Sequence, residues 1–334
     1  MSRVRVLVLR GGPSDEFDVS IRTGFSVLNA LDDTLFEPID VIVTKAGTWL
    51  HDGRERYPEH LLHACDVVFN ALHGTYGEDG TVQRLLDRFG IPYTGSGAYA
   101  SSIAMHKGFT KEHLRGTSIL LPRHTLVRRD EHMHIGARAS QIRDTFGPHY
   151  VIKPARSGSS LGVSLIRNGI NLSRAIESLL AHHDEVMVEE YIEGKEVTCG
   201  VVERFRNHAL YALPPVLIVP PPEASFFDEK VKYDGTTQEL CPAPLSHDDK
   251  ATIEQAALHV HETLGLSQYS RSDFILSPHG LYFLEVNTLP GLTTESLFPK
   301  ALRAVGASQS IFINHLVHDA LAQRRTRVVP YVHV

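Results

Sequence analysis

The sequence predicts a mixed architecture, an α/β domain built on a parallel sheet followed by an α+β part built on antiparallel strands. Through the first hundred residues, short β-branched runs alternate with helical patterns, which is typical of parallel strands joined by crossover helices. Beyond Glu190 the predicted strands become longer, which favours antiparallel pairs. The chain has 334 residues, too many for one compact domain, so we expect two or three.

The N-terminal domain is expected to alternate strand and helix. We predict strands over residues 4–9, 39–43 and 66–70, and helices over residues 20–31 and 81–89. The turn formers Gly95, Ser96 and Gly97 then mark a domain boundary. This domain is therefore assigned residues 1–97.

Two further domains and a tail are expected to follow. Residues 98–189 should hold a basic helix over 107–114, a strand ending at 153, a loop over 155–160, a helix with Asn171 as N-cap, and a strand over 186–189. Residues 190–323 should hold strands over 196–202, 209–213, 270–276 and 281–286, and helices near 248–264 and 308–323. Residues 214–222 are proline-rich and expected to be extended, and residues 324–334 form a short tail.

Composition excludes several classes of protein. Lys and Arg number 33 against 39 Asp and Glu, without a basic block, which argues against nucleic acid or an anionic membrane as partner. The longest apolar runs, near ten residues, are too short to span a membrane. The three cysteines, Cys65, Cys199 and Cys241, are far apart, which fits a reducing cytoplasm and offers neither a disulfide framework nor a zinc site.

The most informative segment is a predicted hairpin over residues 271–287. A three-residue loop, 278–280, would pair Ser277 with Leu281, Ile275 with Phe283, Asp273 with Glu285, and Arg271 with Asn287. A four-residue loop would instead put Asp273 and Glu285 on opposite faces.

In the first register, the two carboxylates have Cβ atoms about 5 Å apart, which is costly unless a cation sits between them. Asn287 adds a third oxygen on the same face. Such hard oxygen ligands select Mg²⁺ or Mn²⁺. The alternative interpretation of these residues is a solvated polar edge.

Two other segments offer groups suited to a nucleotide. Lys153 ends an apolar strand and precedes a Gly- and Ser-rich turn over 155–162, which suits a polyphosphate although it is not a Walker A loop. Further on, Glu189, Tyr191 and Glu196 surround a glycine turn, where carboxylates could accept from an adenine amino group and from ribose hydroxyls. The alternatives are a flexible turn and a solvated loop.

Polar loops also follow two predicted parallel strands, over residues 11–16 and 71–80. Open α/β sheets bind ligands at the carboxyl ends of such strands. Gly11 and Gly12 lack the G-x-G-x-x-G spacing, which disfavours a dinucleotide site. Each loop read alone could equally be a plain surface turn.

Taken together, the motifs resemble those of the D-alanine–D-alanine ligases of the ATP-grasp superfamily, in order from residue 4 to about 321. The resemblance rests on residues 73–80 (HGTYGEDG), 93–97 (YTGSG), 284–293 (LEVNTLPGLT), and a loop over 226–233 followed by Cys241-Pro242-Ala243. It implies a pre-ATP-grasp N-terminal domain followed by a two-domain ATP-grasp fold. ATP would lie between the two antiparallel sheets, and two D-alanines near the N-terminal domain.

The resemblance also implies roles for individual residues. Those implied for ATP are Lys107, Lys153 and Lys232 at the phosphates, Glu189 with the backbone of Tyr191 and Ile192 at adenine, Glu196 at the ribose, and Phe283 and Asn287. Those implied for two Mg²⁺ or Mn²⁺ ions are Asp273, Glu285 and Asn287. Those implied for the amino acids are Glu16 and His73 at the first D-alanine, Ser159 and Tyr233 bonded towards Glu16, Arg271 and the Gly291 N–H at the oxyanion, and Ser296 and Leu297 at the second D-alanine.

The implied activity is ATP-dependent ligation of two D-alanines through an acyl phosphate, for peptidoglycan precursors, by a cytoplasmic homodimer. Two alternatives stay open: a D-alanine–D-lactate or D-alanine–D-serine ligase, and a nucleotide-binding regulator without catalysis. Tyr233 favours an amine nucleophile, and the intact Arg271, Asp273 and Glu285 argue against lost catalysis. The chain departs from the family pattern at Ser157, where many relatives carry an acidic residue, and at Arg84, where a small residue is usual.

Overall fold

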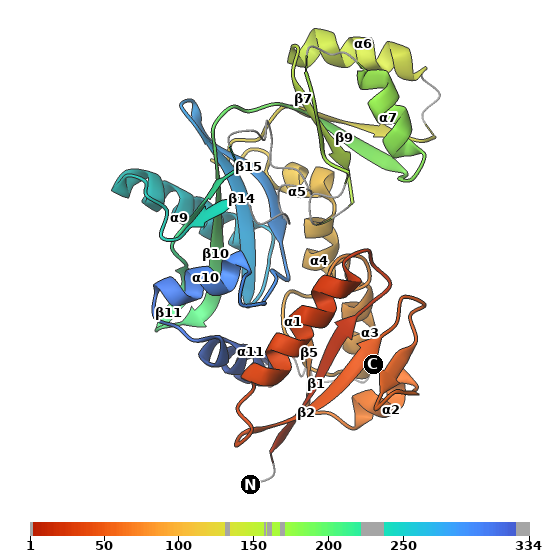
Figure 1. Cartoon of the computed structure of the whole chain (residues 1–334), viewed down its shortest axis with the longest axis vertical. Helices are drawn as coiled ribbons and strands as arrows, with labels where there is room; N and C mark the ends of the chain where they lie inside the picture. Colours follow the sequence, from red (N-terminus) through yellow and green to blue (C-terminus); the bar gives the residue numbers. More distant parts are fainter. Residues whose placement is uncertain are drawn as a thin grey trace, which may run out of the picture.

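The computed structural model describes residues 3–130, 134–156, 158, 162–167, 171–221 and 237–324, and within them the chain forms three sheets (Figure 1). Four residues singled out in the sequence, Ser157, Ser159, Lys232 and Tyr233, lie outside the described residues, as do the loop over 226–233 and the tail from 325 onward. Within the described part, no helix is long and apolar enough to cross a membrane.

The N-terminal sheet is parallel at its centre, as predicted. Its strands are β1 (Val4–Gly11), β2 (Phe36–Val43), β3 (Trp49–His51), β4 (Arg54–Glu55) and β5 (Val67–Asn70), in the order β4-β3-β2-β1-β5. β1 pairs in parallel with β2 and β5 and lies in the middle of this parallel part, where its side chains from Val6 to Leu9 are fully buried. The sequence pattern missed β3 and β4, which are too short to show a strand period.

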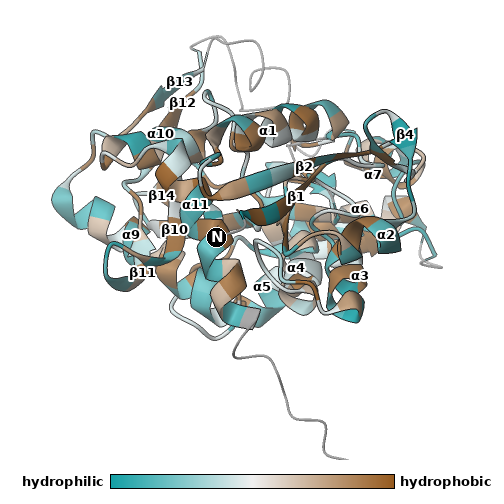
Figure 2. Ribbon diagram, turned by 90° about the horizontal axis from the view of Figure 1, so that it is seen from below, coloured by the Kyte–Doolittle hydropathy of each residue, from teal (hydrophilic) through white to brown (hydrophobic). Residues whose placement is uncertain are grey.

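Helices cover both faces of this sheet. α1 (Phe17–Ala30) packs on one face, and α2 (Pro58–His63) and α3 (Thr81–Phe89) pack on the other. The last helix among the described residues, α11 (Gln309–Arg324), joins α1: its Phe312 and Leu316 share a core with Val6 of β1 and Phe69 of β5. Figure 2, seen from below, shows α11 beside β1, whose apolar ribbon is brown. The two ends of the chain therefore build one core.

The central sheet is antiparallel and small. Its strands are β6 (His124–Arg128), β7 (Tyr150–Pro154), β8 (Ser164–Ile166) and β9 (Glu185–Glu190), in the order β6-β9-β7-β8. α6 (Ile135–Phe146) and α7 (Leu172–Leu180) supply Ile142 and Ile176 to its core. Asn171 precedes α7 as predicted, but it has a φ of 66° and its side chain makes no capping hydrogen bond. That part of the prediction is wrong.

The C-terminal sheet is antiparallel, as predicted. Its strands are β10 (Lys195–Phe205), β11 (His208–Ala212), β12 (Val216–Val219), β13 (Gln238–Leu240), β14 (Tyr269–Ser277) and β15 (Gly280–Asn287), in the order β13-β12-β10-β14-β15, with β11 on β10. α9 (His247–Thr263) packs on one face, and α10 (Leu297–Ala304) packs on the other. The proline-rich stretch contains β12, so it is extended as expected.

Two helices join the N-terminal sheet to the others. α4 (Ala98–Met105) and α5 (Lys107–Leu114) follow the glycine turn at 95–97, and their Ala100, Ala104 and Leu114 lie in the core of the C-terminal sheet. Figure 1 shows α5 between the central and C-terminal sheets. The domain boundaries at residues 97 and 189 stay a prediction, because packing crosses them.

The β14–β15 hairpin differs from the prediction at its turn. The loop has two residues, 278 and 279, so Ser277 pairs with Gly280 and Phe274 with Phe283, and the predicted pairs Ser277–Leu281 and Ile275–Phe283 are wrong. A β-bulge between Asp273 and Phe274 then inserts one extra residue on β15, Leu284. The bulge restores the predicted pairs Asp273–Glu285 and Arg271–Asn287.

Candidate active site

The β14–β15 hairpin carries two carboxylates that face each other, and each has a protein cation as its partner. Asp273 and Glu285 are register partners. Arg271 donates from Nε and Nη2 to the two oxygens of Asp273, each at 2.9 Å. Lys107 Nζ, at the start of α5, lies 3.1 Å from Glu285 Oε2. Arg271 and Lys107 therefore offset the repulsion between the two carboxylates.

Asp273 is held by two further donors. Asn287 donates from Nδ2 to Asp273 Oδ2 at 3.2 Å, and the hydroxyl of Thr198 donates to Oδ1. Thr198 lies on β10 as the other register partner of Asp273, a pairing that the sequence analysis missed. Burial alone would lower the pKa of Arg271, but the charge and hydrogen bonds of Asp273 raise it above its usual value. Arg271 is therefore charged at any physiological pH.

The oxygen atoms on this hairpin fit a hard divalent cation. Among the described residues, no group of three or more His, Cys, Asp or Glu side chains could hold a metal by itself. Asp273, Glu285 and Asn287 supply two carboxylates and one amide from adjacent positions of two paired strands. Mg²⁺ and Mn²⁺ accept such donors and complete their shell with water and phosphate oxygens. The set therefore suits a cation that binds together with a nucleotide.

A buried carboxylate, Glu189 at the end of β9, lies between two lysines. Lys111 Nζ of α5 is 2.8 Å from Glu189 Oε1, and Lys153 Nζ of β7 is 2.7 Å from Oε2. Glu189 is only 2% exposed. Burial alone would raise the pKa of Glu189, but Lys111 and Lys153 together lower it to about 2. Glu189 and Lys153, which the resemblance assigns to different parts of the nucleotide, are thus in direct contact. Lys111 was missed because it lies in a helix pattern with no motif of its own.

The segment that links β9 to β10 borders a groove. Tyr191 and Ile192 lie at its edge, and the tip of the β14–β15 hairpin forms the opposite side. The groove has a volume of about 800 Å³ and is lined by Tyr191, Ile192, Glu193, Gly194, Lys195, Asp249, Leu276, Ser277, Pro278, His279 and Tyr282. Glu196 follows on β10, where it pairs with Ile275 of β14. The segment therefore runs alongside the hairpin tip.

Phe283 does not fit the role implied for it. Its side chain is fully buried beside Phe274, with ring centroids 5.9 Å apart, in the core that α9 covers. It therefore offers no surface to a nucleotide. The bulge explains the error, because the extra residue, Leu284, shifts which side chains of β15 face each side of the sheet.

The two polar loops of the N-terminal domain meet, as predicted. The hydroxyl of Ser14 donates to the His73 carbonyl oxygen at 2.6 Å, and His73 Nε2 lies 2.8 Å from Thr23 Oγ1 of α1. His73 is 4% exposed. Burial lowers the pKa of His73, and this outweighs the charge of Glu16, which would raise it. The imidazole is therefore neutral near pH 7. Thr23 was missed because its only signal is a place on the buried face of α1.

Glu16 lies against two glycines from different loops. A β-carbon at Gly74 would stand 2.8 Å from Glu16 Oε2, and one at Gly158 would stand 2.7 Å from the same oxygen. Gly74 also has a φ of 68°, which favours glycine. Glu16 is thus next to the Gly- and Ser-rich loop after β7, as the sequence predicts. Ser159, its expected partner in that loop, lies outside the described residues.

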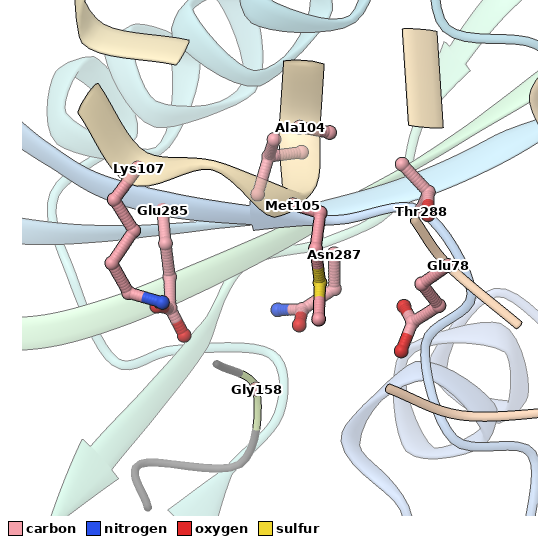
Figure 3. A pocket seen from close by; sticks show the side chains of 9 residues that line it. Glu78, Ala104, Met105, Lys107, Gly158, Glu285, Asn287 and Thr288 are labelled. Carbon is pink, nitrogen blue, oxygen red and sulfur yellow. The ribbon is translucent and has the colours of Figure 1, made fainter. Parts of the chain in front are cut away.

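A second carboxyl group nearby, Glu78, was missed. Its Oε2 accepts from the Gly74 N–H at 2.7 Å and its Oε1 from the Leu289 N–H at 3.2 Å, so it joins loops of the first and last domains. Burial, with a contribution from Glu16, raises the pKa of Glu78 to about 8. Figure 3 shows Glu78 across a pocket from Lys107, with Glu285 beside Lys107. The motif over residues 73–80 signalled this residue without indicating its role.

The loop before α10 brings together the residues expected at the second amino acid. Ser296 Oγ lies 2.8 Å from Thr293 Oγ1 and 3.0 Å from where a β-carbon at Gly291 would stand. Leu297 is the first residue of α10 and packs partly on the core. Gly291, Ser296 and Leu297 are therefore neighbours, in the segment that leads from Asn287 to the start of α10.

Two family models match the chain. The model described as D-ala D-ala ligase N-terminus matches residues 52–96, and the model described as D-ala D-ala ligase C-terminus matches residues 117–318. The second covers all of the central sheet and the whole β14–β15 hairpin.

Curated proteins and solved structures agree with these matches. A D-alanine–D-alanine ligase of Syntrophotalea carbinolica is 38% identical over 323 residues, covering 96% of this chain and 97% of the relative. A structure of D-alanine–D-alanine ligase from Bacillus anthracis complexed with ATP has a TM-score of 0.79 and 30% identity, covering 97% and 99%. The VanG D-Ala:D-Ser ligase from Enterococcus faecalis has a TM-score of 0.82 and 28% identity, covering 96% and 100%.

Proposed function

Because the chain belongs to the D-ala D-ala ligase family, we propose that it joins two D-alanines into D-alanyl-D-alanine, with conversion of ATP to ADP and phosphate. The dipeptide would supply peptidoglycan precursor synthesis. The observation that carries this proposal is the Asp273–Glu285 pair, with Arg271 and Lys107 as its partners. Together with the divalent ions that its carboxylates would hold, that set can bind, orient and neutralise a transferring phosphoryl group.

In the nucleotide site, charge is arranged to hold a polyphosphate. Lys107 and Lys153 stand at the phosphates, and Glu189 with the backbone of Tyr191 and Ile192 stands at the adenine. Glu196 takes the ribose. Mg²⁺ or Mn²⁺, two ions held by Asp273, Glu285 and Asn287, would neutralise charge on the β- and γ-phosphates.

The first step makes the carboxylate of the first D-alanine reactive. An oxygen of that carboxylate attacks the γ-phosphorus of ATP, the bond to the β–γ bridging oxygen breaks, and an acyl phosphate and ADP result. Glu16 orients the ammonium group of this D-alanine, and the neutral His73 lies beside it. The lysines spread the charge that develops, so positioning and electrostatics supply most of the rate.

In the second step, the deprotonated amine of the second D-alanine attacks the acyl carbon. The tetrahedral oxyanion faces Arg271 and the Gly291 N–H, and phosphate leaves with the bonding electrons as the peptide bond forms. Ser296 and Leu297 receive the second D-alanine. Water must be kept away from the acyl phosphate, because it would hydrolyse it. We expect Ser159, Lys232 and Tyr233 to contribute to this exclusion of water.

A second candidate activity is ligation of D-serine, which the structural likeness to the VanG D-Ala:D-Ser ligase supports, and a third is ligation of D-lactate. Tyr233 favours an amine nucleophile, which disfavours D-lactate. We further propose a homodimer in the cytoplasm, where ATP is supplied.

The test is phosphate release by the purified protein with ATP, Mg²⁺ and D-alanine alone. Release with D-alanine alone, and D-alanyl-D-alanine as the product by mass spectrometry, is the expected result. Release only when D-serine or D-lactate is added would assign the second or the third activity. No release under any of these conditions would refute ligase activity.

A further inference from the structure

Lys111 is buried where two sheets meet, and no role has been given to it above. Its ammonium lies 2.8 Å from Glu189 Oε1 on β9 and donates to the Phe283 carbonyl oxygen on β15 at 3.4 Å. The side chain is fully buried and stands over the Phe283 ring, 5.9 Å from its centroid. A lysine is rarely buried in this way unless a fixed partner holds its charge.

Two lysines of α5 connect this one helix to two carboxylates of the site, Glu285 and Glu189. Lys107 and Lys111 are four residues apart and so lie on the same side of the helix. Lys107 reaches Glu285 of the C-terminal sheet, and Lys111 reaches Glu189 of the central sheet. The position of Glu189 is therefore fixed relative to the hairpin that carries the other acidic groups.

We propose that Lys111 is a positioning residue that fixes Glu189 as a hydrogen-bond acceptor and so sets a preference for 6-aminopurine over 6-oxopurine nucleotides. This rests on the proposed function, in which Glu189 accepts from the adenine amino group. Each carboxylate oxygen has two lone pairs, so one lysine on each leaves capacity for a base amino group. A 6-oxo group would place a second acceptor against Glu189, with no proton between the two oxygens to form a hydrogen bond.

Lys111 suits this role better than Lys153 does. Lys153 is 5% exposed and is assigned to the phosphates, so bound ATP shares its charge. Lys111 is enclosed by Glu189 and Phe283 and has no exposed route to a phosphate. When Lys153 turns to the nucleotide, Lys111 is the cation that keeps Glu189 charged and in place.

The experiment compares ATP with ITP, which differs at purine position 6 by an oxygen in place of the amino group. Lys111→Met keeps the side-chain length and removes the charge. We expect the ATP KM to rise about tenfold and the ratio of kcat/KM for ATP over ITP to fall at least about fivefold. Glu189→Gln, measured in parallel, should lower the same ratio, since its amide can also donate to the 6-oxo group.

Arg204→Leu is the matched control. Arg204 forms an ion pair with Asp319 between β10 and α11, on the far side of the sheet from α5, so its loss should lower Tm and leave the ATP:ITP ratio unchanged. A Lys111→Met ratio within twofold of wild type, with the Glu189→Gln ratio lowered, would overturn the proposal for Lys111 alone.

Two further outcomes are separable. An unchanged ratio in Glu189→Gln would refute the adenine role of Glu189, and the proposal with it, while wild-type ligase activity would still stand. If Lys111→Met does not fold, Lys111→Arg keeps the charge but moves the donor. The proposal then requires a lowered ratio in Lys111→Arg, and a wild-type ratio there would refute it.

Discussion

The Glu16 carboxylate lies so close to Gly158 that a β-carbon at position 158 would stand 2.7 Å from Glu16 Oε2. Glu16 belongs to the N-terminal domain, whereas Gly158 follows the strand that carries Lys153. A group proposed to orient an amino acid therefore touches the loop expected over the phosphates. The size of residue 158 should affect the amino-acid site more than the stability of the fold.

Gly158→Ala tests this contact. Glu16 Oε2 is the end of a flexible side chain, so we expect it to move and the fold to survive, with Tm within about 2 °C of wild type. The KM for the first D-alanine should rise about three- to tenfold. Gly136→Ala, on α6 with its nearest neighbour at 3.4 Å, is the control and should change neither quantity. An unchanged KM in Gly158→Ala would mean that this contact does not constrain Glu16.

Glu16→Gln removes the negative charge of the side chain and so tests the proposed contact with the ammonium group of the first D-alanine. A charge-assisted hydrogen bond to an ammonium is worth roughly 1.5–3 kcal/mol, so the KM for the first D-alanine should rise about ten- to a hundredfold. The ATP KM should stay nearly unchanged, because no nucleotide group is assigned there. Steady-state kinetics with each substrate varied, and a melting curve, check this. A normal D-alanine KM with a lowered Tm would leave Glu16 a structural carboxylate only.

Asp273→Asn should lower activity at least about tenfold, a barrier increase of about 1.4 kcal/mol. The substitution removes a proposed metal ligand and also weakens the two hydrogen bonds from Arg271. High Mg²⁺ should restore part of the loss, since a weakened metal site fills at higher concentration. Titration of initial rate against Mg²⁺ is the measurement. Near-wild-type turnover at low Mg²⁺ would contradict a metal role for Asp273.

Glu78 makes stability depend on pH. The pKa of Glu78 is about 8 in the folded protein, compared with a usual value of 4.5. Between these two pH values, the folded protein therefore keeps a proton on Glu78 that the unfolded chain has released. Stability from this group is therefore complete below about pH 4.5 and is lost as pH rises through about 8. Glu78→Gln cannot ionise, so the Tm of wild type minus that of the variant should fall between pH 5 and 8.5 without added metal. A difference that is constant across this range would show that Glu78 does not titrate as described.

The sequence analysis predicted the elements that have a clear period and failed where contacts cross between domains. α3 and α5 begin and end where the pattern places them, over 81–89 and 107–114. Asp273 and Glu285 were paired correctly although the turn was wrong, because the bulge at Leu284 compensates for the shorter loop. Local sequence does not show such a bulge.

Three of the missed site residues share one property. Lys111, Thr198 and Glu78 each have a partner at least 75 residues away or on another sheet, namely Glu189, Asp273 and Leu289. Their residue types are ordinary for their positions, so only the assembled structure shows what they contact. The loops that hold Glu16 and His73 were singled out because they follow parallel strands, where ligands bind, and the family resemblance then implied the roles of the two residues.

The core shared by β1 and α11 has a consequence for synthesis of the chain on the ribosome. Val6 and Phe69 are made early, whereas Phe312 and Leu316, which cover them, emerge only at the end of translation. Until then the part of this sheet face that α1 does not cover is open to water, and a nascent chain must keep it from aggregating. A product that stops before residue 309 would carry every proposed site residue and still expose this face, so it should be a preferred target for proteolysis.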